Sequence, residues 1–190
     1  MPSARPFTAP ERHFAGLISR LTHMNPFLPE RVSCEREALG RAFVPVDPVL
    51  SMRPDRNQEN PNMLRICERT EALVERVKSA LTAGAALDDS DALLYEDLVL
   101  FLLYFRHEGT FYRGLGRAEP LNRARATYSR FVEEVQDLLG VPGRNFPVRE
   151  DPAHLYACFF QVCRAYHHIF FHIIGRSMPA ARLRAAVWQS

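Results

Sequence analysis

The segment at residues 153–175, AHLYACFFQVCRAYHHIFFHIIG, constrains the fold more than any other part of the chain. Spacing of three and four residues places one apolar stripe along a helix, formed by Leu155, Phe159, Val162, Tyr166, Ile169 and Ile173. A second apolar stripe lies beside it, and Arg164 is the one arginine, lysine or acidic residue in the segment. A helix that is apolar on most of its circumference is buried on most of it. The segment is therefore predicted to be the buried central helix of an all-α domain.

Helical patterns in the rest of the chain predict a single-domain bundle of about six to seven helices around that central helix. Thr8 and Glu11 form a capping-box signature, and further amphipathic segments follow near residues 30–39, 62–83, 92–107 and 121–139. Residues 42–61 contain four prolines and are predicted to form a long loop. Residues 109–116, GTFYRGLG, are predicted to form a shorter loop.

Size and composition limit the classes of function. A chain of 190 residues suits one domain, and its net charge of +2 is too small to indicate nucleic-acid or anionic-membrane binding. The longest apolar run, residues 92–105, is short for a membrane span and contains Glu96 and Asp97. The four cysteines form no C-x-x-C pair, which is typical of buried thiols in a reducing compartment. We expect a cytoplasmic protein without membrane or direct nucleic-acid contact.

The histidines of the apolar segment raise the question of a metal. His168 and His172 have H-x-x-x-H spacing, His154 lies on the same stripe, and Glu96 could supply a further ligand from the other buried helix. The simpler interpretation is a set of core or interface histidines that are hydrogen-bonded to carboxylates, because no H-E-x-x-H motif is present. We expect no cofactor, and a helical metal- or haem-binding sensor is the alternative.

A small-molecule pocket is predicted above the central helix, with the two loops as its edges. Arg106 and His107 lie just before the GTFYRGLG stretch and Tyr112 and Arg113 lie inside it, and the basic residues among them suit an anionic ligand. The chain has no Gly-rich phosphate loop and no G-x-S-x-G motif, so we expect no enzyme activity.

Two stretches together resemble a known family. Residues 25–40, NPFLPERVSCEREALG, and residues 167–190, HHIFFHIIGRSMPAARLRAAVWQS, are similar to the N-terminal region of bacterial sigma-54-interacting transcriptional regulators. In that family a helical N-terminal domain precedes an AAA+ ATPase domain that carries the nucleotide-binding P-loop. This chain has no P-loop, no G-A-F-T-G-A loop and no identifiable helix-turn-helix, so the family's ATPase and DNA-binding residues have no positions here.

The resemblance implies that residues 1–176 form a regulatory domain that senses a signal through protein–protein contacts and a small-molecule pocket. Residues 177–190 would begin a linker helix toward the ATPase domain of the same polypeptide, since the helical pattern reaches Ser190 without a stop signal. A helix this short is marginal alone in water. We therefore expect Leu183, Val187 and Trp188 to form an interface, with the ATPase domain or with the same helix of a second subunit.

Overall fold

The computed structural model describes residues 5–50, 60–116 and 120–190. Within these ranges the chain forms helices and no strand, which confirms the predicted all-α class. The α-helices are α1 (Ala9–His23), α2 (Glu30–Leu39), α3 (Pro61–Thr82), α4 (Asp89–Gly116), α5 (Leu121–Leu139), α6 (Pro147–Glu150), α7 (Pro152–His172) and α8 (Met178–Gln189), and a 3-10 turn η1 (Gly40–Ala42) follows α2. None of the described helices combines the length and the hydropathy that a membrane span requires.

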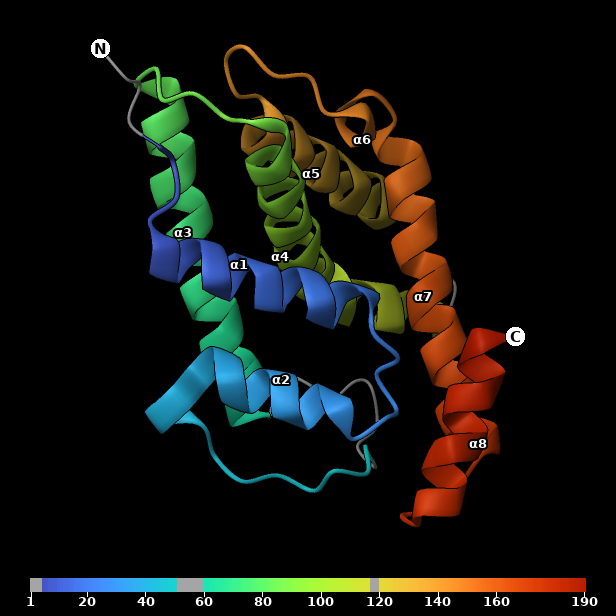
Figure 1. Ribbon diagram of the computed structural model, residues 1–190. Coiled ribbons are helices and arrows are strands. Elements are labelled where there is room, and N and C mark those ends of the chain that lie inside the picture. The colour runs from blue at the N-terminus through green and yellow to red at the C-terminus, as the bar shows by residue number, and fades with distance from the viewer. Residues whose placement is uncertain (1–4, 51–59, 117–119) are drawn as a thin grey trace.

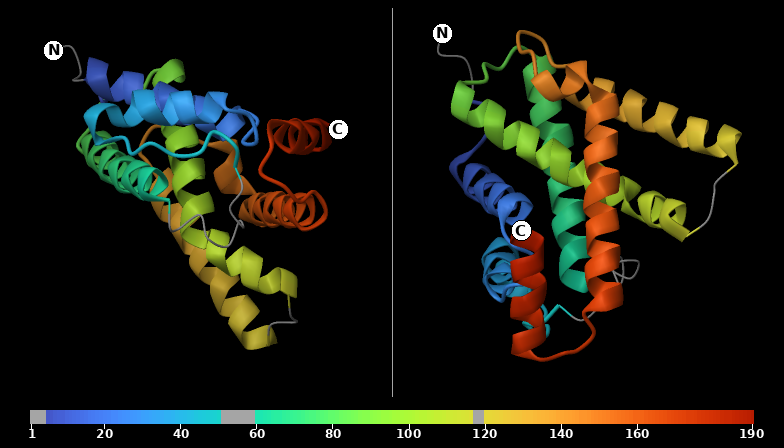
Figure 2. Two further views of the ribbon diagram at one scale, coloured as in Figure 1. Left: turned by 90° about the horizontal axis from the view of Figure 1, so that it is seen from below. Right: turned by 90° about the vertical axis from the view of Figure 1, so that its right-hand side faces the viewer.

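Helix α4 is the centre of the bundle. It packs against α1, α3, α5 and α7, while α1 crosses α4 and α2 crosses α3 (Figure 1). Between residues 95 and 103, the apolar residues that are at most 2% exposed are Tyr95, Leu98, Val99, Leu102 and Leu103. Toward its C-terminal end α4 runs beside α5, and this pair extends away from α1 and α2 (Figure 2).

The predicted bundle is therefore present, but its central helix is α4 and not the segment at residues 153–175. Helix α7 covers most of that segment and buries fully only Leu155, Cys163 and Ile169. It packs on α4 and α5 and meets α8, and its remaining face is exposed. That face carries alanines and histidines, which cost little free energy when they are exposed to water. It also carries Phe171, which is 67% exposed. The sequence pattern alone did not distinguish these exposed residues of α7 from residues of the core.

The GTFYRGLG stretch is helical rather than a loop, because α4 continues to Gly116. Phe111 is 1% exposed, and its ring centroid lies 5.0 Å from that of Tyr156 on α7. A Cβ atom at Gly114 would lie 3.5 Å from the ring of Phe160, an ordinary van der Waals distance, so α7 packs beside this position without requiring a glycine there. Tertiary packing thus outweighs the low helix propensity of the glycines.

Helix starts follow the signals in the sequence. The Glu11 carboxylate accepts hydrogen bonds from the backbone N–H and the hydroxyl of Thr8, at 2.8 and 2.7 Å. Asn60 caps α3, Asp151 caps α7 and Ser177 caps α8, each by accepting a backbone N–H of the first turn. These caps fix where α3, α7 and α8 enter the bundle.

The central position of α4 can be tested with two alanine substitutions. Leu98→Ala should lower the free energy of unfolding by about 2–5 kcal/mol, because Leu98 is fully buried. Phe171→Ala on α7 should change it by about 0.5 kcal/mol or less, because most of that ring is already in water. Chemical denaturation measures both, and equal effects would contradict the assignment of α4 as the core helix.

Candidate functional site

A cavity of about 250 Å³ lies where α1, the start of α2, α4, α7 and α8 meet. Its wall is mainly apolar: Leu21, Met24, Pro26, Leu50, Met63, Leu100, Phe101, Phe105, Phe159, Val162 and Trp188. Five polar residues complete the described wall, namely Thr22, Arg31, Asn60, Tyr104 and Tyr166. Since a cavity of about 150 Å³ can hold benzene, this one has room for a molecule with one ring or a short chain.

Arg31 is the one residue with a formal charge among the described residues that line the cavity. It lies in the first turn of α2, where the helix dipole adds to its positive charge, and it is 7% exposed. Its Nη1 pairs with Oε1 of Glu35, which lies one turn later and is fully buried. Burial raises the pKa of Glu35, and the Arg31 charge opposes this.

The Arg31–Glu35 pair leaves two buried polar atoms without a hydrogen-bond partner. These are the Nε of Arg31 and the Oε2 of Glu35. Buried polar groups in folded proteins nearly always have a partner, and an exception calls for an explanation. Because Arg31 lines the cavity, this buried pair lies directly behind the cavity wall.

An aromatic cluster closes the cavity on the side of α8. The Phe27 ring centroid lies 5.2 Å from that of Tyr166, 5.3 Å from that of Phe170 and 5.9 Å from that of Trp188. Tyr166 and Trp188 are also in contact, at 4.8 Å. Phe27 belongs to residues 25–40 and the other three rings to α7 and α8. The two ends of the chain therefore meet at one cluster beside the cavity.

Hydrogen bonds fix α8 in this position. Arg184 is 2% exposed and donates to the carbonyls of Ile173 and Gly175, at the end of α7, and to that of Leu50. The Nδ2 of Asn25 donates to the carbonyl of Ala185 at 2.9 Å. Arg184 thus satisfies carbonyls that the α7 terminus leaves unpaired, and it ties α8 to the bundle.

The predicted interface residues of α8 separate into two groups. Leu183 and Val187 are exposed, at 54% and 45%. Trp188 is half-buried against Phe27 and Tyr166 of its own chain, and it lines the cavity. The chain turns at Gly175 and lays α8 back on the bundle, so residues of the same chain cover part of Trp188. An interface of these three residues with another domain or subunit stays a prediction.

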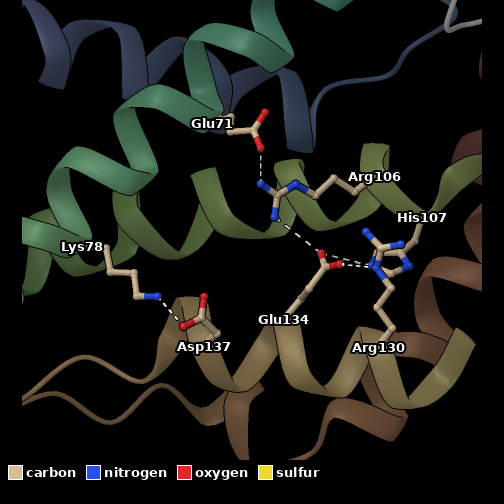
Figure 3. A network of polar contacts seen from close by, with 7 residues as sticks. All are labelled: Glu71, Lys78, Arg106, His107, Arg130, Glu134 and Asp137. Atoms are coloured by element: carbon tan, nitrogen blue, oxygen red, sulfur yellow. Dashed lines mark hydrogen bonds and ion pairs between the residues drawn. The ribbon is translucent and has the colours of Figure 1, made fainter. Parts of the chain in front are cut away.

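The predicted ligand-binding residues Arg106 and His107 belong to an ion-pair network between helices (Figure 3). Arg106 pairs with Glu71 of α3 and, at 3.5 Å, with Glu134 of α5. The Nε2 of His107 lies 3.3 Å from Oε2 of Glu134, and burial lowers the pKa of this histidine despite the carboxylate. The network connects α3, α4 and α5.

Tyr112 and Arg113, the other two predicted ligand residues, do not join Arg106 and His107 around a shared cavity. The Tyr112 hydroxyl is buried near Cys163, and burial raises its pKa. Arg113 is exposed and donates to Thr110 of its own helix at 2.8 Å. The predicted set therefore does not form one ligand site.

Arg106 does line a second cavity, of about 370 Å³, between α3 and α4. Its charged groups include Glu71, which already pairs with Arg106. The described residues that border this cavity come from α3 and α4, whereas those of the first come from both ends of the chain. The first cavity, whose described wall draws on more elements of the fold, is the stronger candidate for a ligand site.

The predicted metal ligands are not assembled into a site. His154, His168 and His172 lie on the exposed face of α7, and Glu96 is half-buried on α4. The rings of His168 and His172 stack with centroids 6.1 Å apart. In the part of the chain that the structure describes, no group of three His, Cys, Asp or Glu side chains is placed to hold a metal ion.

Sequence reasoning missed Arg31 as a site residue. The available signal was the Arg31–Glu35 spacing of four residues in a predicted helix, which more often marks an exposed pair. No family model, curated protein or solved structure matches the chain. Function is therefore inferred from the cavity and from the two stretches that carry the family resemblance.

The role of Arg184 in holding α8 can be tested against its exposed neighbour Arg182. Arg184→Leu should lower the hydrogen-exchange protection of residues 178–189 about tenfold or more, because bonds from a buried guanidinium to three carbonyls are lost. Arg182→Leu should leave that protection unchanged. Equal protection in both variants would show that α8 is held by other contacts.

Proposed function

We propose that this chain is a non-enzymatic regulatory domain that senses a small, mainly apolar molecule in the 250 Å³ cavity. The observation that carries the proposal is a mainly apolar cavity whose described wall includes five polar residues, with Arg31 the charged one among them. Apolar lining with a few converging polar groups is the usual composition of a small-molecule site.

The chemistry of the wall favours binding over catalysis. Among the described residues that line the cavity, none has a carboxylate, an imidazole or a thiol. Those groups supply most general bases and many nucleophiles in enzymes. A guanidinium, hydroxyls and an amide can orient a ligand.

Helix α8 is the element that would report an occupied cavity. Trp188 forms part of the wall, and Leu183 and Val187 of the same helix are exposed. A ligand that pushes on Trp188 would shift α8 and change the surface that these two residues present. A partner that contacts α8 would then respond to the ligand.

The resemblance to sigma-54-interacting regulators suggests the kind of protein in which such a sensor would work. The stretches that carry it, residues 25–40 and 167–190, pack together through Phe27 and Trp188 beside the cavity. In this setting the domain regulates transcription, and α8 leads toward the AAA+ ATPase domain of the same polypeptide. Leu183 and Val187 would contact that domain or a second subunit.

The gene sequence tests this setting. The reading frame beyond Ser190 should encode a G-x-x-x-x-G-K phosphate-binding loop, followed by a G-A-F-T-G-A loop. A reading frame that ends nearby, or continues without these motifs, would contradict the assignment to sigma-54-dependent activators. The sensing proposal itself depends only on the cavity.

A cavity-blocking variant tests the sensing proposal. Trp188 is the single tryptophan, so its fluorescence reports ligand binding directly. A library of small apolar molecules should give hits that change this signal and raise the melting temperature. Val162→Phe should abolish both effects, because its larger side chain occupies the cavity, while Ala165→Phe on the exposed face of α7 should preserve them. Hits that bind both variants equally would contradict a site in this cavity.

A further inference from the structure

One stripe of exposed side chains runs along α7 on the outside of the bundle (Figure 2). Its members follow each other in helical steps of three and four residues: His154, Cys158, Gln161, Ala165, His168 and His172. None of them is an arginine, a lysine, an aspartate or a glutamate. Helix α8 packs on another side of α7, where its Trp188 contacts Tyr166. The stripe therefore faces solvent, and the sensing function does not use it.

The N-terminal end of the stripe carries two metal-binding side chains one helical turn apart, His154 and Cys158, called here the N-terminal pair. The Sγ of Cys158 lies 3.5 Å from the Nε2 of His154. A tetrahedral zinc ion with a Zn–S distance of about 2.3 Å and a Zn–N distance of about 2.05 Å holds its sulfur and nitrogen ligands about 3.6 Å apart. The N-terminal pair thus has the spacing of two ligands of one zinc ion.

The other end of the stripe carries His168 and His172, called here the C-terminal pair. Their ring planes are 9° apart and their centroids are separated by 6.1 Å, so the two imidazoles lie side by side. Both side chains are exposed and can change rotamer rapidly. Small rotations can therefore direct one nitrogen of each ring at a shared ion. Imidazole is a common zinc ligand, so this end supplies two more ligands.

Each pair alone is half of a structural zinc site, which has four protein ligands. Within the described ranges of one chain, no third His, Cys, Asp or Glu side chain is placed to complete either pair. A second copy of the chain can complete both pairs, because they lie on the same side of one helix. His154 and His168 are 14 residues apart, which corresponds to about 3.9 turns and about 21 Å along the helix axis.

We propose that two copies of the chain pack α7 against α7 in antiparallel orientation and bind two zinc ions between them. A twofold axis midway between the two pairs places the N-terminal pair of each copy opposite the C-terminal pair of the other. Each ion is then held by three imidazoles and one thiolate, and Cys158 releases its thiol proton to the solvent on binding. Gln161 and Ala165 lie between the two ions, where their uncharged side chains let the helices approach without like-charge repulsion.

This site differs from the metal site that the sequence suggested, in which Glu96 of the same chain was a ligand. Glu96 lies on α4 and is half-buried, whereas Cys158 is exposed on α7 beside His154. The proposal is independent of the cavity, because none of the four zinc ligands lines it.

Zinc titration of the chain in a phosphine reductant tests the shared site. Analytical ultracentrifugation should show the mass doubling from one chain to two, and metal analysis of the dimer should find one zinc per chain. A chelator should reverse the doubling. Cobalt(II) in place of zinc should give the thiolate charge-transfer band and the intense visible bands of a tetrahedral site. His167→Ala removes an exposed histidine of α7 outside the stripe and should behave as wild type.

Two double variants test the antiparallel arrangement. His154→Ala with Cys158→Ser removes the N-terminal pair, and His168→Ala with His172→Ala removes the C-terminal pair. Each variant alone should stay monomeric with zinc, because every site would keep only two ligands. The two variants mixed should form a heterodimer with one zinc ion, because one complete site remains. The substituted side chains are exposed, so both variants should fold, which circular dichroism checks.

The outcomes separate the parts of the proposal. Zinc bound by wild type without a change in mass would overturn the shared site, and no zinc binding by wild type would overturn the metal site altogether. Double variants that dimerise alone with zinc, without any gain on mixing, would show a parallel contact and contradict the antiparallel arrangement. None of these results bears on the sensing function, which is tested by ligands of the cavity.

Discussion

The packing of Phe27 against α7 and α8 is the interaction on which the cavity depends. Phe27 follows α1, is 1% exposed, and contacts Tyr166, Phe170 and Trp188. It joins the α1–α2 end of the chain to the α7–α8 end. Aromatic contacts of this kind add to the hydrophobic free energy of burial. Without this cluster, α8 would lose its main apolar contact and the cavity would lose one wall.

Helix α4 gives the cavity its rigid side. One face of α4 packs in the main core through Leu98, Leu102 and Leu103, while Leu100, Phe101 and Tyr104 reach the cavity. The ion pairs of Arg106 hold the same helix to α3 and α5 (Figure 3). The cavity therefore has a firmly packed wall on α4 and a wall on the less extensively packed α8. In such a site a ligand can displace α8 while α4 stays in place.

Much of the fold could be predicted from the sequence because helix signals are local. The all-α class, the capping box of Thr8 and Glu11 and the helix after residue 177 follow from side chains within a few positions of each other. The central helix could not be predicted in this way. Alanine and histidine on α7 look compatible with burial, and only tertiary contacts show that α4 takes that place. Similarly, the packing of Phe111 keeps α4 helical through the glycines of residues 109–116.

The candidate site was less predictable, because its polar residues depend on distant partners. Arg31 becomes a site residue through its burial beside α4 and α7, and Arg184 becomes a structural one through carbonyls at the end of α7. Arg106 and His107 suggested a ligand by their position beside a predicted loop. Their charges instead meet Glu71 and Glu134 from neighbouring helices.

A crystal structure of the chain with a small apolar molecule that changes the Trp188 fluorescence decides whether the cavity is a ligand site. We expect electron density for the molecule between α4, α7 and α8, in contact with Trp188. A cavity filled by the protein's own side chains, or a molecule bound only elsewhere on the surface, would contradict the sensing function.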